Sequence, residues 1–570
     1  MRKPSRRPAQ KSAKASVKAP VRAAKASPKR TARSVAKRAG ERSKKKTPLR
    51  TPARRKPVMR KAVLGVAEAA PVVLESALPL PLPALPSALR LLIASSEVVP
   101  YSKTGGLADM VAALAKSMAR RGHRVGIVTP LYLGLFEKWP TLKKLDYFLR
   151  LPLGNDWLEA EIFTLEPEPN LTVYFVHQPT LFQRPGLYGE KNRDYPDNAQ
   201  RFLYLSKAVA HLARYLTWAP QLVHLHDWQV GLVPLLLRHQ QSREGWTDAT
   251  PSVLTIHNLA YQGIYMKEMF AYANLPESDL SPEGAEFNGF LNCLKTGVLL
   301  ADRLTTVSPR YAREITTSEF GCGLDPILRH RNTILRGILN GVDYDDWQTE
   351  KNAHLPTPYS ASDLSGKAEC KAALQAEVGL PVAPGVPLFG TVTRLADQKG
   401  MDIQLGALEE MLSADLQFVL LGSGSVELER EYLNLARRFP NKVSIRIGYD
   451  EGLSHRIEAG SDFFLMPSRF EPCGLNQMYS LRYGTIPIVR VTGGLDDSVV
   501  DIADDRALAD GIKFQELSPR ALAKAIRKAL ALFGVPGLLT RYRINGIHAD
   551  FSWTRTSMEY EEVYRSMIQR

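Results

Sequence analysis

The chain has 570 residues, enough for two or three domains, and 44% of them are hydrophobic, as in an ordinary globular protein. Its net charge of +17 comes from one end, because residues 1–62 hold 24 Lys and Arg against the single acid Glu41. The remainder of the chain is slightly acidic, which excludes a basic body. The four cysteines show no CxxC or metal-ligand spacing, which fits a reducing compartment without a disulfide framework.

Residues 1–62 are rich in Lys, Arg, Ala, Pro and Ser and hold few large apolar side chains. Such a segment cannot bury enough surface to offset its chain entropy, so we expect a disordered basic tail. Three roles stay open at this stage. The tail is a site for nucleic acid or another polyanion, an organelle transit peptide, or a solubilising extension without a partner.

Residues 63–89 form an Ala/Pro/Leu linker, in which four prolines break the apolar stretch 78–86 and exclude a transmembrane helix there. No continuous apolar core follows the first basic residues, so we expect no secretory signal and no membrane partner. These features predict a cytoplasmic protein, or an organelle protein such as a plastid one if the tail is a transit peptide.

The body opens with a predicted strand at residues 91–94, a helix from about 107 to 121 and a second strand at 125–129. Between the first strand and the helix stand Lys103, Gly105 and Gly106. Free amides at a helix start, together with the helix dipole, favour a phosphate, and the lysine adds a full positive charge. The alternative is a tight turn with a solvated lysine.

The same alternation of strand and helix runs through the rest of the chain and indicates an α/β body. The further predicted strands fall into two series, at 223–226, 252–256 and 304–307, and then at 387–392, 417–421, 443–447, 463–466 and 486–489. We therefore predict two Rossmann-like domains facing a cleft, at residues 90–345 and 346–570. An amphipathic helix over 553–568 ends the second range, and its pattern does not say which domain it packs on.

Three more glycine turns follow predicted strands, at residues 422–424, 473–476 and 492–494. Four such turns in two domains suggest a diphosphate held in the cleft. Arg394 and Lys399 follow the strand 387–392, where two cations neutralise a leaving diphosphate. Taken alone, this pair is more typical of a solvated loop.

Four motifs carry a resemblance to a known family: KTGGLAD at 103–109, HDW at 226–228, TIHNLAYQG at 255–263 and PSRFEPCGL at 467–475. In this order they resemble bacterial glycogen synthases and plant starch synthases. The resemblance implies a GT-B fold and transfer of glucose from ADP-glucose to the non-reducing end of an α-1,4-glucan such as glycogen or starch. It implies retention of the anomeric configuration, and neither a metal nor another cofactor.

The resemblance also implies roles for particular residues. Lys103, Gly105 and Gly106 hold the donor diphosphate, Arg394 and Lys399 compensate its charge, and Tyr449 packs near the adenine. Glu471 binds the donor and helps to stabilise the transition state, while His257 and Asp227 contact the sugar. The remaining donor-binding positions are Asn258, Gly474, Leu475 and Asn476.

Two departures from the family pattern affect this assignment. Asn476 stands where many relatives have Thr, and Asp496 stands where many have a small residue. We expect the additional acid, beside the 492–494 turn, to weaken diphosphate binding. Competing interpretations are a UDP-glucose-dependent synthase, a glucan phosphorylase, for which we find no pyridoxal-phosphate lysine motif, and a polyanion-binding protein that uses only its tail.

Overall fold

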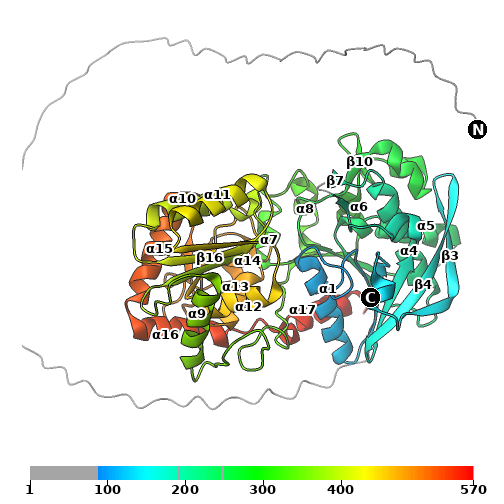
Figure 1. Ribbon diagram of the computed structural model, residues 1–570. Coiled ribbons are helices and arrows are strands. Elements are labelled where there is room, and N and C mark those ends of the chain that lie inside the picture. Colours follow the sequence, from blue (N-terminus) through cyan, green and yellow to red (C-terminus); the bar gives the residue numbers. More distant parts are fainter. Residues whose placement is uncertain (1–87, 191–192, 245–249, 569–570) are drawn as a thin grey trace, which may run out of the picture. The chain divides into compact units, whose positions relative to one another are not determined.

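The computed structural model describes residues 88–190, 193–244 and 250–568 (Figure 1). The predictions for the tail at 1–62, and for all but the last two residues of the linker at 63–89, lie outside these ranges. Within the described ranges no helix has both the length and the apolar character needed to cross a membrane.

The first lobe is built on a nine-stranded sheet in which β1 lies at the centre, between β2 and β8. Its strands pair in parallel apart from β3 and β4, which form an antiparallel extension at one edge. The last four residues of β1 and every residue of β8 and β9 are buried, as expected for strands covered on both faces. The strands, in sheet order, are β14 (Leu335–Gly337), β13 (Arg303–Thr306), β9 (Ser252–Ile256), β8 (Leu222–His226), β1 (Arg90–Ala94), β2 (Arg124–Pro130), β5 (Leu171–His177), β4 (Asp156–Glu168) and β3 (Lys143–Leu153).

The second lobe is built on a six-stranded, wholly parallel sheet. Counted along the chain, its strands lie in the order 3-2-1-4-5-6, which is that of a dinucleotide-binding sheet. The predicted α/β architecture with two Rossmann-like sheets is thereby confirmed. The strands, in sheet order, are β17 (Val443–Ile447), β16 (Gln417–Gly422), β15 (Leu388–Val392), β18 (Phe463–Met466), β19 (Ile486–Arg490) and β20 (Ile512–Phe514).

Helices cover both faces of the second sheet. One apolar cluster joins the sheet to α10, α11 and α15, and a second cluster joins it to α9 and α12. The helices of the second lobe are α9 (Ser365–Val378), α10 (Met401–Met411), α11 (Val426–Arg438), α12 (Glu451–Gly460), α13 (Asn476–Arg482), α14 (Gly493–Ser498), α15 (Pro519–Phe533) and α16 (Pro536–His548).

The first lobe carries shorter elements as well as its main helices. Its helices are α1 (Gly106–Arg120), α2 (Leu135–Lys138), α3 (Pro179–Phe182), α4 (Asn198–Tyr215), α5 (Val233–Glu244), α6 (Cys293–Leu300), α7 (Pro309–Glu314) and α8 (Asp325–His330). Two small sheets complete it, formed by β6 (Gly189–Glu190) with β7 (Arg193–Asp194), and by β10 (Ile264–Met266), β12 (Phe290–Asn292) and β11 (Glu286–Phe287).

The C-terminal helix α17 (Trp553–Ile568) packs on the first lobe. It contacts α1, and its side chains Tyr560 and Tyr564 are fully buried in the first lobe's core. The Tyr564 hydroxyl lies 2.8 Å from Nδ1 of His224. The chain thus passes between the lobes twice. The two connecting segments are in contact, since the Val342 amide donates to the Phe551 carbonyl at 2.7 Å.

Candidate functional site

A cavity of about 1020 Å³ lies where the strands of both sheets end. In parallel sheets, ligands bind outside the carboxyl ends of the strands, where neighbouring connections diverge. The loops after β1 and β8 supply one wall, and the loops after β15 and β18 supply the other. All thirteen residues predicted for the site line this cavity: Lys103, Gly105, Gly106, Asp227, His257, Asn258, Arg394, Lys399, Tyr449, Glu471, Gly474, Leu475 and Asn476.

The loop that carries Lys103 is held by a residue that the sequence analysis did not single out, the buried Glu97. Its carboxylate accepts from the Thr104 amide at 2.5 Å and from the Thr104 hydroxyl at 2.6 Å. The Tyr188 hydroxyl donates to the same carboxylate at 2.6 Å. An acid directly after a buried strand, close to a glycine turn, is the signal that points to this role.

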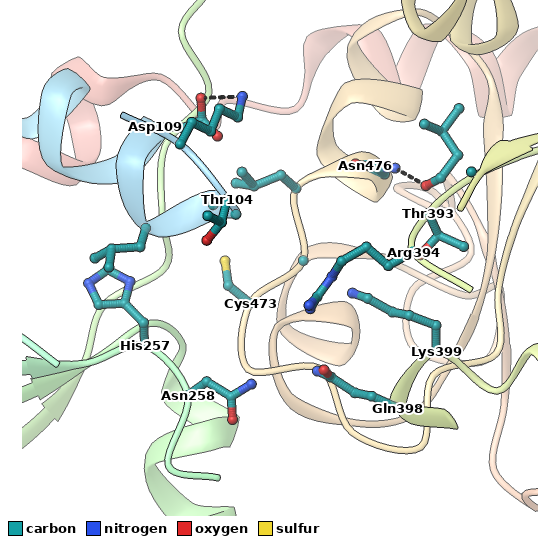
Figure 2. Close-up of a pocket in the computed structure, with 18 of the residues that line it drawn as sticks. Thr104, Asp109, His257, Asn258, Thr393, Arg394, Gln398, Lys399, Cys473 and Asn476 are labelled. Atoms are coloured by element: carbon teal, nitrogen blue, oxygen red, sulfur yellow. Dashed lines mark hydrogen bonds and ion pairs between the residues drawn. The ribbon is translucent and has the colours of Figure 1, made fainter. Parts of the chain in front are cut away.

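Lys103 and the start of α1 form the positive end of this wall. The Lys103 ammonium lies 2.8 Å from the Asp109 carboxylate (Figure 2). Burial favours the neutral amine, but Asp109 outweighs it, and the pKa of Lys103 is raised, so the charge persists. No side chain caps the helix at Gly105, and a Cβ there would meet nothing within 4 Å, which leaves the first amides open to a ligand.

Asp227 and His257 stand at the ends of the neighbouring strands β8 and β9. Asp227 has φ of 59°, a backbone conformation that costs a non-glycine residue energy and is found at functional sites. Its carboxylate accepts from the His257 amide at 2.7 Å, and burial raises its pKa to about 7. Burial lowers the pKa of His257 to about 3, so this imidazole is neutral, with Nε2 2.9 Å from Nδ1 of His226.

Arg394 and Lys399 bring positive charge from the second lobe. Figure 2 shows both side chains directed into the same space. The Lys399 ammonium is 2.6 Å from the Glu471 carboxylate, to which the Ser468 hydroxyl also donates at 2.9 Å. Glu471 is buried, whereas Arg394 is exposed, and the described residues give its guanidinium no hydrogen-bond or ion-pair partner. Arg394 is therefore available to an anionic ligand.

The remaining residues of this wall differ in exposure. Tyr449, in the loop between β17 and α12, is 78% exposed and presents its ring to the cavity. The Asn476 side chain donates to the Val392 carbonyl at 2.6 Å, which ties the start of α13 to the end of β15 (Figure 2). Burial raises the pKa of Cys473 to about 12, so this residue is an inert thiol.

One of the four glycine turns is closed to a phosphate by a protein carboxylate, contrary to the prediction. The Gly493 amide donates to both carboxylate oxygens of Glu314, on α7 of the first lobe, at 3.1 Å. The turn at residues 492–494 lies outside the lining of the cavity. A protein carboxylate thus occupies the position at which we expected a ligand anion.

The expectation that Asp496 adds a negative charge beside the diphosphate is wrong for a related reason. Its carboxylate forms ion pairs with Arg310, across the lobes, and with Lys513 at 2.9 Å. Burial alone would raise its pKa, but Lys513 and Arg310 lower it, so the acid is ionised and neutralised locally. Neither Asp496 nor its neighbour Asp497 lines the cavity, and no additional negative charge faces a diphosphate from this turn.

Comparison with known proteins agrees with this geometry. Residues 90–330 match the family model described as starch synthase catalytic domain, and residues 379–536 match the model described as glycosyl transferases group 1. A glycogen synthase from Anaeromyxobacter sp. strain Fw109-5 is 49% identical over 482 residues, covering 84% of this chain and 99% of that protein. A glycogen synthase from Myxococcus xanthus is 47% identical, covering 84% and 100%.

Solved structures show the same likeness. The catalytic domain of starch synthase IV from Arabidopsis thaliana, bound to ADP and acarbose, aligns with a TM-score of 0.78 and 34% identity, covering 85% of this chain and all of that chain. A sucrose-phosphate synthase from Thermosynechococcus elongatus aligns with a TM-score of 0.53 and 18% identity, which shows a shared fold alone.

Proposed function

Because the chain belongs to the glycogen and starch synthase family of glycosyltransferases, we propose that it extends an α-1,4-glucan with glucose from ADP-glucose, retaining the anomeric configuration. The observation that carries the proposal is a single cavity with cations on both walls, Lys103 on one and Arg394 with Lys399 on the other. The related starch synthase IV structure is bound to ADP, which supports an adenine nucleotide as the donor.

The positive groups match the part of the donor that leaves. Cleavage of the glycosidic bond to a nucleoside diphosphate builds negative charge on the β-phosphate. Lys103, the open amides at the start of α1 and the unpaired guanidinium of Arg394 stabilise that charge, and their contribution is largest in the transition state. No general acid has to protonate a diphosphate leaving group that is neutralised in this way.

The ion pair between half-buried Lys399 and buried Glu471 serves both ends of the breaking bond. Lys399 is held at 2.6 Å by Glu471, so the ammonium is positioned before the donor arrives. A bound diphosphate is a second anionic partner for Lys399. Lys399 then neutralises less of the negative charge on Glu471, and this carboxylate faces the sugar. This carboxylate favours the positive charge that develops at the anomeric carbon.

His257 and Asp227 form the sugar side of the site. A neutral imidazole suits this position, because an imidazolium would repel the oxocarbenium-like sugar. The strained Asp227 orients His257 through the backbone hydrogen bond and itself faces the cavity. We propose that both contact sugar hydroxyls and that Tyr449 packs against the adenine. The two glycogen synthase relatives are bacterial, which supports a bacterial cytoplasmic enzyme over a plastid one.

The test is to incubate the full chain with glycogen and radiolabelled donors. We expect label to enter glycogen from ADP-glucose much faster than from UDP-glucose. Incorporation from neither donor would refute the synthase assignment, and faster incorporation from UDP-glucose would refute the donor assignment alone. A phosphorylase would instead release glucose 1-phosphate from glycogen and phosphate, and would show pyridoxal absorbance.

A further inference from the structure

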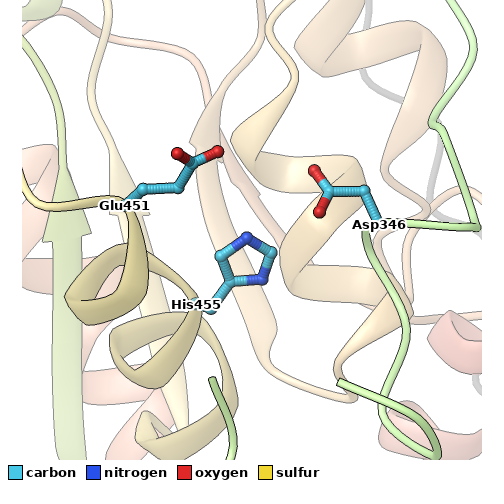
Figure 3. A group of neighbouring side chains, drawn as sticks. All are labelled: Asp346, Glu451 and His455. Atoms are coloured by element: carbon cyan, nitrogen blue, oxygen red, sulfur yellow. The ribbon is translucent and has the colours of Figure 1, made fainter. Parts of the chain in front are cut away.

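A histidine meets two carboxylates that line the edge of the donor cavity, Asp346 and Glu451. Asp346 belongs to the segment that connects the lobes, and Glu451 and His455 belong to α12. A separation of four residues places the two helical side chains on one face of α12. One ligand atom from each of the three residues lies within 4.8 Å of the other two (Figure 3).

His455 carries the observation that singles this cluster out. The residue is fully buried, and its Nε2 has no hydrogen-bond partner among the described residues. Figure 3 shows the outer ring nitrogen directed toward the space between the two carboxylates. A buried polar atom without a partner is destabilising, so each one calls for an explanation such as a bound ion or water.

The other side of the ring is fixed in the manner of a metal ligand. Nδ1 lies 2.8 Å from the Tyr483 hydroxyl and 3.2 Å from the side-chain nitrogen of Asn352. Trp347 stacks on the ring at 4.0 Å between centroids with 14° between planes. Metal binding requires the tautomer in which Nδ1–H donates to Tyr483, which leaves the lone pair on Nε2. Neighbouring groups therefore set the orientation of the imidazole before any ion arrives.

The charges favour a divalent cation. Asp346 and Glu451 are exposed, and the described residues give neither carboxylate a hydrogen-bond or ion-pair partner. Two neighbouring cations are paired elsewhere, Lys103 with Asp109 and Arg456 with Glu377. Two carboxylates and one imidazole nitrogen then face one space.

We propose that Asp346, Glu451 and His455 bind a divalent transition-metal ion, and that Zn²⁺ is the ion whose ligand preferences they match. An imidazole nitrogen with two carboxylate oxygens makes three protein ligands, and Mg²⁺, which prefers oxygen alone, fits this set less well. The ion ties the connecting segment to α12 in the second lobe. It takes no part in glucosyl transfer, for which the family pattern implies no metal.

The test measures Zn²⁺ binding directly, by isothermal titration of the chelator-treated full chain at pH 7. We expect one saturable site, with Mg²⁺ binding at least tenfold more weakly. Asp346→Asn and Glu451→Gln each remove a ligand at an exposed position and should weaken Zn²⁺ affinity at least tenfold. Asp345→Asn is the matched control. It removes the same charge from the neighbouring residue, whose carboxylate pairs with Arg120.

His455→Gln tests the nitrogen ligand, with Co²⁺ as a spectroscopic probe. Co²⁺ bound by imidazole and carboxylates should give visible absorption bands that this variant loses. If His455→Gln does not fold, the two carboxylate variants decide the question alone. The proposal is overturned by absence of saturable Zn²⁺ binding, by equal affinity in Asp346→Asn and Asp345→Asn, or by Mg²⁺ binding as tightly as Zn²⁺.

Discussion

Replacement of Glu97 by Gln tests whether the loop that carries Lys103 must be held in place for donor binding. In the native chain one carboxylate oxygen accepts from the Thr104 and Tyr188 hydroxyls, both at 2.6 Å, and the other accepts from the Thr104 amide at 2.5 Å. A Gln side chain keeps one acceptor oxygen and turns an NH₂ group toward a donor. At least one buried hydrogen bond is then lost and its donor is left unpaired.

The magnitude follows from the kind of bond that is lost. Hydrogen bonds to a charged group contribute about 1.5–3 kcal/mol, and a buried unpaired donor costs about 1–3 kcal/mol. A loop that relaxes to satisfy the Thr104 amide moves Lys103 and Gly105 away from the diphosphate. If at least half of a hydrogen-bond loss of about 3 kcal/mol reduces the free energy of donor binding, KM for ADP-glucose rises at least about tenfold.

The assay is steady-state incorporation of glucose into glycogen, with thermal unfolding measured on the same preparations. Tyr188→Phe provides a graded comparison, because it removes one of the three donors and leaves the carboxylate in place, so its KM should rise less. A native KM for Glu97→Gln in a protein with native thermal stability would refute the role assigned to this carboxylate.

Three further predictions address the site and the tail. Lys103→Ala should raise KM for ADP-glucose about tenfold or more with little change in kcat. Glu471→Ala should mainly lower kcat, by about a hundredfold or more. Steady-state kinetics measure both effects, and near-native constants in both variants would contradict these roles. Because the folded-state pKa of Asp227 is raised to about 7, its burial costs stability that grows as pH rises from about 4 to about 7. Asp227→Asn should therefore gain thermal stability relative to the native chain over that window, and a constant difference would contradict the raised pKa. Deletion of residues 1–62 should abolish salt-sensitive retention on DNA and leave incorporation of glucose unchanged, and loss of catalysis instead would make the tail part of the enzyme.

The parts of the fold that could be predicted are the elements whose burial requires a recognisable pattern of apolar residues. Strands such as β9 and β18 are buried along their whole length and appear as short apolar runs between turns. The site could be predicted because parallel strands deliver their following loops to one edge of a sheet. Motifs spaced over more than 350 residues therefore met in one cavity.

The parts that could not be predicted depend on partners far away in the chain. The turn at Gly493 looks in sequence like the turn at Gly105, and the difference is Glu314, which lies 179 residues earlier. Strands β3 and β4 are partly exposed and alternate in burial, so they lack the apolar runs of the central strands. Glu97 was overlooked because a polar turn after a strand usually faces solvent, whereas here the carboxylate is buried.

The position of α17 has a consequence for how the protein is made. The first lobe's sheet is complete by residue 337, yet its core is closed by Tyr560 and Tyr564, which leave the ribosome only after the whole second lobe. Until then the groove that receives α17 is an exposed apolar surface, carried through synthesis of the whole second lobe. A fragment that ends near residue 345 should therefore be prone to aggregation, and adding a synthetic peptide of residues 549–568 should restore its solubility.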